Sequence, residues 1–149
     1  MAASAVPVST TYELLSTQFK APEFIQFTGP LNERTVIDYF ANSPFYDKQC
    51  TNQMIRMQNI ANFTSQIGRW TAAEEEEQLK KFQGTEYVLA NSHPPSLFVI
   101  HRRERSSETE TRVVAAYYII NDAVMQAPDV YQVIGNRLVR FLTWIQACH

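Results

Sequence analysis

The sequence has little glycine and little cysteine, and each shortage excludes a class of functional site. Four glycines in 149 residues cannot build a phosphate-cradling loop or a dinucleotide fingerprint, so no nucleotide cofactor is expected. The two cysteines, Cys50 and Cys148, have no Cys-x-x-Cys partner. A structural role for Cys50 is favoured over a thiolate nucleophile, and a chain of this length can bury a core without a disulfide.

An excess of charge of either sign is also missing. Lys and Arg number 13 and Asp and Glu number 15, which gives a formal net charge of -2. Because no basic field is available to attract phosphates, direct binding of nucleic acid is not expected. The longest apolar run, Val113–Ile120, is far shorter than the roughly 20 residues of a membrane-spanning helix, so no membrane contact is expected. The stretch 1–11 lacks a secretory signal and predicts a disordered lead-in.

Motifs for metal binding and catalysis are absent from the sequence as well. The three histidines, His93, His101 and His149, have no second ligand type at metal-binding spacing, and the aspartates are scattered singly. We therefore predict no catalytic residue, no metal and no cofactor, and a protein that is not an enzyme. The residues leave one alternative open. A free-standing α+β domain could bind a small ligand, or act as an enzyme, through side chains that only the fold brings together.

What the chain does contain is a series of helical patterns with start and stop signals. Short helices are predicted over 10–18, from a plausible N-cap at Asn32 to the stop at Ser43–Pro44, and from Thr51 to about Phe63. In the last of these, Met54 and Met57 recur on one face and suggest adaptable apolar packing.

The stretch after Trp70 predicts a further, mostly solvated helix. Thr71 followed by Glu74 is a capping-box pattern, and the four consecutive glutamates lie at the positive end of the helix dipole. Favourable pairs one turn apart, Glu76 with Lys80 and Glu77 with Lys81, explain this acidic run better than a basic partner does.

The strand patterns are short and alternate with turn signals. Strands are predicted at Phe24–Phe27, from Glu86, at Leu97–His101 and at Val113–Ile120, with the polar stretch Arg102–Arg112 as a connection. A long amphipathic helix then runs from about Asp129 towards the end of the chain. The pattern predicts one α+β core domain over 12–149, in which a small antiparallel sheet of about three to five strands packs with flanking α-helices.

Two groups of residues are candidates for contact with a partner. Arg102, Arg103 and Arg105 form the one local basic cluster, which could dock an acidic or phosphorylated partner or could be a solvated turn. Phe45 and Tyr46 lie in a connection between helices, where polar residues are usual. Burial against the chain's own sheet is favoured for these two rings, with burial under a partner subunit as the alternative.

Several segments together resemble a known family. Val36–Phe40 followed by Asn42–Lys48 closely resembles the signature of the Mediator subunit 6 family. Blocks around Pro22–Gln26, Gly84–Leu89 and Tyr117–Asp129 are similar to the same family in the same order. The stretch 64–83 corresponds to a variable helical insertion of the fungal style, and the family's polar tail after the last helix is absent.

The resemblance implies a non-catalytic scaffold subunit of the Mediator head module in the nucleus. Such a subunit works as a transcription coactivator that links regulators to RNA polymerase II and supports assembly of the pre-initiation complex. The implied partners are other head subunits, notably subunits 8 and 17, with the middle module nearby. RNA polymerase II would be reached through the assembled complex.

Overall fold

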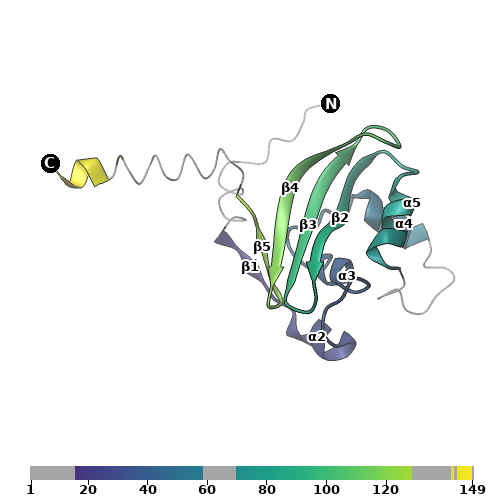
Figure 1. Ribbon diagram of the computed structural model, residues 1–149, viewed down its shortest axis with the longest axis horizontal. Helices are drawn as coiled ribbons and strands as arrows, with labels where there is room; N and C mark the ends of the chain where they lie inside the picture. Colours follow the sequence, from purple (N-terminus) through teal and green to yellow (C-terminus); the bar gives the residue numbers. More distant parts are fainter. Residues whose placement is uncertain (1–15, 59–69, 129–141, 143, 149) are drawn as a thin grey trace.

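Five antiparallel strands form a sheet at the centre of the fold, in the spatial order β1-β5-β4-β3-β2 (Figure 1). This structure is a computed structural model, and it describes residues 16–58, 70–128, 142 and 144–148. In chain order the strands are β1 (Gln18–Phe19), β2 (Gly84–His93), β3 (Leu97–Arg105), β4 (Thr111–Ile120) and β5 (Ala123–Gln126). The predicted α+β class with a small antiparallel sheet is confirmed.

Strands β3 and β4 reach further into the polar segment than the sequence predicted. The connection expected over 102–112 shrinks to residues 106–110, because the arginines continue the ladder between β3 and β4. The sequence analysis also missed β5. Asn121 and Asp122 both have positive φ, 48° and 69°, as in the type I′ turns that join antiparallel strands. Their side chains tolerate this left-handed conformation better than most, which lets β4 reverse into β5.

The helices are short and lie between or before the long strands: α2 (Pro22–Thr28), α3 (Val36–Phe40), α4 (Thr51–Gln58) and α5 (Ala72–Leu79). The strand predicted at Phe24–Phe27 is wrong, because these residues belong to α2. Pro22 starts that helix, where its missing N–H costs no hydrogen bond. Gly29 ends it with φ 81°, a conformation that favours glycine, and donates its N–H to the Ile25 carbonyl at 2.8 Å.

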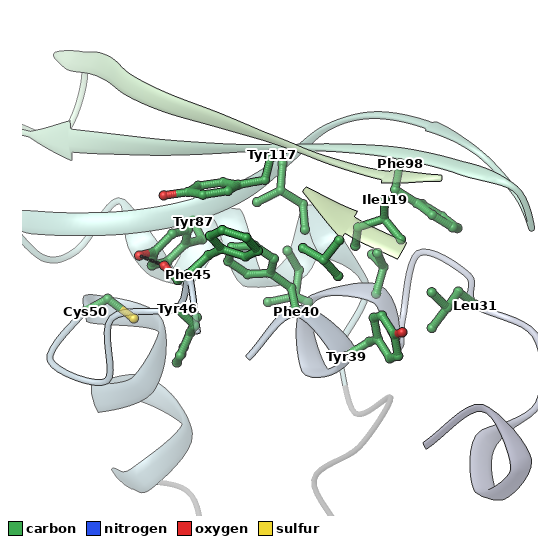
Figure 2. Close-up of a cluster of buried hydrophobic side chains, with 14 residues drawn as sticks. Leu31, Tyr39, Phe40, Phe45, Tyr46, Cys50, Tyr87, Phe98, Tyr117 and Ile119 are labelled. Atoms are coloured by element: carbon green, nitrogen blue, oxygen red, sulfur yellow. Dashed lines mark hydrogen bonds between the residues drawn. The ribbon is translucent and has the colours of Figure 1, made fainter. Parts of the chain in front are cut away.

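The main core lies between the sheet and α3 (Figure 2). Figure 2 shows Tyr117, Ile119 and Phe98 projecting from the sheet towards Tyr39 and Phe40 of α3. The side chains from β3 and β4 in this layer alternate along each strand, as the two-residue period requires. The buried set is Leu31, Val36, Ile37, Tyr39, Phe40, Phe45, Tyr46, Cys50, Tyr87, Phe98, Ile100, Tyr117, Ile119 and Val124.

A second, smaller core covers the other face of the β2 end of the sheet. Val88 points away from the main core, because it neighbours Tyr87 on the same strand. It packs with Ile55 of α4 and Leu79 of α5. In α4, Ile55 is buried, whereas Met54 and Met57 are 40% and 57% exposed. The prediction that these two methionines lie on the packed face of the helix is therefore wrong.

Other expectations fall wholly or partly outside the described residues. The helix predicted over 10–18 overlaps the short strand β1 at Gln18, and residues 10–15 of that prediction lie outside the described residues. The long C-terminal helix is not supported at its predicted length. The structure describes helix only at 142 and 144–147 of that segment. Within the described residues, no helix is long and apolar enough to cross a membrane.

Candidate partner interface

The loop Ser43–Asp47, which carries part of the family signature, is held against the sheet by a single tyrosine of β2. The Tyr87 hydroxyl donates to the Phe45 carbonyl at 3.1 Å and accepts from the Asp47 N–H at 3.0 Å. At the other end, the Ser43 hydroxyl donates to the Phe40 carbonyl at 2.7 Å and so ties the loop to α3. Because both ends are anchored by buried groups, the loop backbone is fixed relative to the sheet.

Phe45 and Tyr46 are buried in the chain's own core, with 5% and 7% of their surface exposed. The Phe45 ring lies 5.5 Å from the Tyr117 ring, and the Tyr46 ring lies 5.2 Å from the Tyr87 ring. These spacings are typical of paired aromatic rings. Of the two burial sites considered from the sequence, the structure places both rings against the chain's own sheet.

Replacing Phe45 with alanine is expected to lower the free energy of unfolding by about 2–4 kcal/mol, because the substitution leaves a cavity beside Tyr117. Chemical denaturation of the wild type and the variant measures this difference. Phe27→Ala is the matched control, since Phe27 is 80% exposed and its loss should change stability by less than about 0.5 kcal/mol. Equal stability of the two variants would refute an internal structural role for Phe45.

Burial changes the ionisation of the aromatic layer. Burial raises the pKa of Tyr46 and Tyr87 far above the usual tyrosine value, and it also raises the pKa of Tyr39 and Tyr117. The pKa of the Cys50 thiol, which lies beside the Tyr46 hydroxyl, is raised by the same cause. Cys50 is therefore a protonated core residue at neutral pH and is unsuited to act as a nucleophile.

These shifts predict that the fold loses stability in alkali. In the unfolded chain a tyrosine loses its proton near its ordinary pKa of 10.0, whereas folded Tyr46 and Tyr87 keep theirs. Their contribution to stability is therefore complete below about pH 10 and is lost as pH rises towards the folded pKa. Thermal melts between pH 8 and about pH 11 should show this fall. Phenolate absorbance should rise with unfolding, and ionisation of these tyrosines in a fully folded protein would contradict the prediction.

Two of the three candidate arginines are engaged within the fold, on the face of the sheet opposite the main core. Arg105 and Arg103 each donate their Nε to the same oxygen of Glu86, at 2.9 Å and 3.0 Å. Arg103 also reaches Glu76 of α5 at 2.9 Å, and Arg105 donates to the Glu108 carbonyl at 2.6 Å. Only 4% of the Arg105 side chain and 1% of Glu86 are exposed. Charge reversal at these two arginines would therefore disturb the fold.

Arg102 differs from its neighbours, because it lies on the main-core face and is one-third exposed. Its nearest carboxylate, Asp47, is 3.9 Å away, at the outer limit of an ion pair. The Nε of Arg102 has no hydrogen-bond partner among the described residues. Its charge is thus the least satisfied of the three.

A hollow of about 960 Å³ brings three of the predicted residues together. Phe45 and Tyr46 line it from the loop, and Arg102 lines it from β3. Arg103 and Arg105 are not among its lining residues. The remaining lining residues are Pro44, Asp47, Glu104, Arg112, Val114, Ala115, Tyr117 and Gln126.

The sequence analysis missed a buried polar group on α4. The Asn52 amide donates to the Tyr87 carbonyl at 2.9 Å and accepts from the Tyr87 N–H at 2.7 Å. It also donates to Glu75 of α5 at 3.0 Å. By matching both backbone groups of Tyr87, this side chain acts as a substitute for a neighbouring strand. No local sequence pattern distinguishes this asparagine from an ordinary helix-start residue.

Buried charge accompanies that amide. Arg56 contacts Asp38 at 3.0 Å and Glu75 at 3.2 Å. Burial opposes the charge on Arg56, but these two carboxylates outweigh it and raise its pKa. The acidic run was interpreted as solvated, yet Glu75 is only 6% exposed. The capping box of Thr71 and Glu74 is confirmed, with hydrogen bonds of 2.8 Å and 3.2 Å.

The predicted pairs one turn apart in α5 are replaced by pairs at shorter spacing. Lys80 contacts Glu77 at 2.7 Å, and Lys81 donates to Gln78 at 3.0 Å.

As for metal sites, no group of three or more potential ligands gathers anywhere in the part of the chain that the structure describes.

Comparison with known proteins gives a consistent picture. A family model described as the MED6 mediator sub complex component matches residues 17–149. A Mediator of RNA polymerase II transcription subunit 6 from Mycosarcoma maydis is 42% identical over 90% of this chain and 62% of its own length. The corresponding protein of Schizosaccharomyces pombe is 32% identical over 92% of this chain and 60% of its own length. The chain spans about six-tenths of the length of these curated relatives.

Solved structures resemble the fold as well. A chain in the structure of the Schizosaccharomyces pombe Mediator head module has a TM-score of 0.73 and 28% identity, covering 91% of this chain and 85% of that one. The structure of the Schizosaccharomyces pombe Mediator subunit Med6 has a TM-score of 0.68 and 29% identity, covering 91% and 92%. On the family match and these identities, the chain belongs to the Mediator subunit 6 family.

Proposed function

We propose that the protein is a scaffold subunit of the Mediator head module, a transcription coactivator that links regulators to RNA polymerase II. The observation that carries this proposal is the similarity of the fold, over 91% of the chain, to a chain in a solved Mediator head module. A subunit of this kind works by position: its sheet and helices hold partner-binding surfaces in a fixed relation. Residues 12–149 would provide that scaffold as a single core domain.

The partners follow from the same proposal. Contacts with other head subunits, notably subunits 8 and 17, would place the protein in the head near the middle module. RNA polymerase II would be reached through the assembled complex, in support of pre-initiation complex assembly. Because that work takes place on chromatin, we propose a nuclear location.

The hollow beside the loop Ser43–Asp47, here named the signature loop, is the favoured contact surface for a partner. Arg102 offers a partly exposed guanidinium whose carboxylate partner is 3.9 Å away, and it can form a closer pair with an acidic residue. Phe45 and Tyr46 form part of the lining of the hollow and hold its shape. In this proposal Arg103 and Arg105 contribute indirectly, because their bonds to Glu86 hold β3 in place.

A non-catalytic role accounts for the unusual ionisable groups of the described residues. The tyrosines with raised pKa are packed against one another in the core, and the buried carboxylates are bonded to arginine and asparagine side chains. These groups serve the fold: Tyr46 and Tyr117 line the hollow, but burial raises the pKa of both, so they do not converge there as an acid and a base must. The alternative of a free-standing ligand-binding domain or enzyme would require such convergence.

Co-purification tests the proposal. The full chain is co-expressed with Mediator head subunits 8 and 17 of the same organism and analysed by size-exclusion chromatography. Stable co-elution is the expected result. A chain that elutes alone, although each partner is folded, would overturn the assignment of these partners and would favour the free-standing alternative.

A further inference from the structure

One long side of strand β4 lacks a strand neighbour over half of its length. β5 pairs with β4 only at Tyr117–Ile120, and the Ala127 N–H extends the contact to the Ala116 carbonyl at 2.9 Å. Along Thr111–Ala115, which we name the open edge, no strand of the described residues lies on the side away from β3. In Figure 1, β5 accompanies the lower part of β4, and the upper part of β4 forms the margin of the sheet.

The two margins of the sheet are treated differently. On the opposite margin, the side chain of Asn52 occupies both backbone groups of Tyr87 in the edge strand β2. The open edge has no equivalent among the described residues. Its Val113 and Val114 are 53% and 43% exposed, although lysine, proline or an inward charge is the usual protection of such an edge. Along the open edge itself, such protection is limited to a β-bulge at Val114 and the charge of Arg112.

The hollow beside the signature loop adjoins this edge. Val114, Ala115 and Arg112 of the open edge line it on one side, and Pro44 and Phe45 line it on another. In an added strand, successive side chains point to opposite faces of the sheet. Alternate side chains of a peptide laid along the open edge would therefore enter the hollow.

We propose that the open edge binds an extended segment of a partner polypeptide, which joins the sheet as an additional strand next to β4. Backbone hydrogen bonds supply the affinity, and an apolar side chain that enters the hollow supplies the specificity. This inference rests on the proposed scaffold function, because it specifies how one partner is held.

Charge adds a second requirement for that segment. Arg112 forms no ion pair with any described residue, and the nearest carboxylate to Arg102 is 3.9 Å away. Asp47 and Glu104 also line the hollow, but Glu104 already accepts a hydrogen bond from Thr85 at 2.7 Å. A carboxylate next to the apolar residue of the bound segment would complete the pairing of the two arginines.

Amide hydrogen exchange of the full chain, alone and within Mediator purified through a tag on that chain, tests the proposal. In the free protein the outward-facing amides of the open edge should exchange rapidly, and in the complex their exchange should slow by about 10-fold or more. Rapid exchange in both states would overturn the proposal. Slow exchange in the free chain would overturn it as well, since the edge would then be paired within the chain itself.

A matched pair of lysine substitutions separates the edge from the rest of the apolar sheet surface. Val114 and Ile120 lie on the same strand and are each 43% exposed, but only Val114 belongs to the open edge. Val114→Lys should reduce recovery of Mediator subunits with the chain by about 10-fold, and Ile120→Lys should leave it within about 2-fold. Both variants should melt like the wild type.

The outcomes distinguish the two proposals. If the wild-type chain recovers no Mediator subunits, the scaffold function itself fails. If the wild type assembles but the two lysine variants behave alike, the scaffold function stands and the strand-addition proposal is wrong.

Discussion

Replacing Arg105 with methionine is expected to lower the free energy of unfolding by about 3–5 kcal/mol, because it leaves a buried carboxylate without one of its two cationic partners. Glu86 is 1% exposed, and one of its oxygens accepts both the Arg105 and the Arg103 Nε. Its other oxygen has no hydrogen-bond partner among the described residues. The Glu86 carboxylate therefore depends on few contacts, and the loss of one cannot be replaced by water. Urea denaturation followed by circular dichroism measures the change.

Arg102→Met is the matched control for this variant. Arg102 belongs to the same strand, but 33% of its side chain is exposed and its ion pair is 3.9 Å long, so its loss should cost less than about 1 kcal/mol. The double variant Glu86→Leu with Arg105→Met should recover part of the stability, because apolar pairs of similar volume often replace buried ion pairs without loss. Equal effects of Arg105→Met and Arg102→Met would show that the buried Arg105–Glu86 pair contributes no more to the free energy of unfolding than the exposed Arg102–Asp47 pair.

Replacing Asn52 with alanine is expected to cost at least about 3 kcal/mol, because three buried polar groups lose a partner, at about 1–3 kcal/mol each. These are the N–H and the carbonyl of Tyr87 and the Glu75 carboxylate, with hydrogen bonds of 2.7, 2.9 and 3.0 Å to the Asn52 amide. Asn52 is fully buried, so bulk water does not reach these three groups in the wild-type fold. Thermal and urea denaturation would both record the loss.

Asn42→Ala provides the comparison. The Asn42 amide also donates to a backbone carbonyl, that of Asp38 at 2.9 Å, but this bond is exposed to solvent. Its removal should cost about 0.5–1 kcal/mol, since water can take the place of the lost donor. If the two asparagine variants were equally stable, the role of Asn52 as a substitute strand neighbour for β2 would have to be abandoned.

The local signals of the sequence were most reliable where the structure depends on neighbours along the chain. The Thr71–Glu74 capping box forms as predicted, because it depends on residues within one turn. The helix predicted from Asn32 to Ser43 also forms, but it is shorter, over Val36–Phe40, and its N-cap is Thr35. The error at Phe24–Phe27 has a local reason as well. The apolar run suggested a strand, but Pro22 and Gly29 supply the start and stop of a helix.

The candidate arginines show why the site was harder to predict than the elements. Arg102, Arg103 and Arg105 are neighbours in the sequence, yet successive residues of a strand point to opposite faces of the sheet. Arg103 and Arg105 therefore meet Glu86, and Arg102 faces the hollow with Phe45. The sequence predicts this separation only if a strand is assigned through all three arginines. Because residues 102–112 were predicted to be a connection, the two-residue alternation was not applied to them.

By itself, the sequence determined the family, the α+β class, the lack of visible catalytic motifs and the apolar residues that build the core. These depend on composition, periodicity and short motifs. Only the tertiary structure decided which polar groups are buried and paired, and which strand edge is left open. Asn52 meets Tyr87 35 residues away, and Arg105 meets Glu86 19 residues away. The free energy of a buried polar group depends on such distant partners, and no local pattern records them.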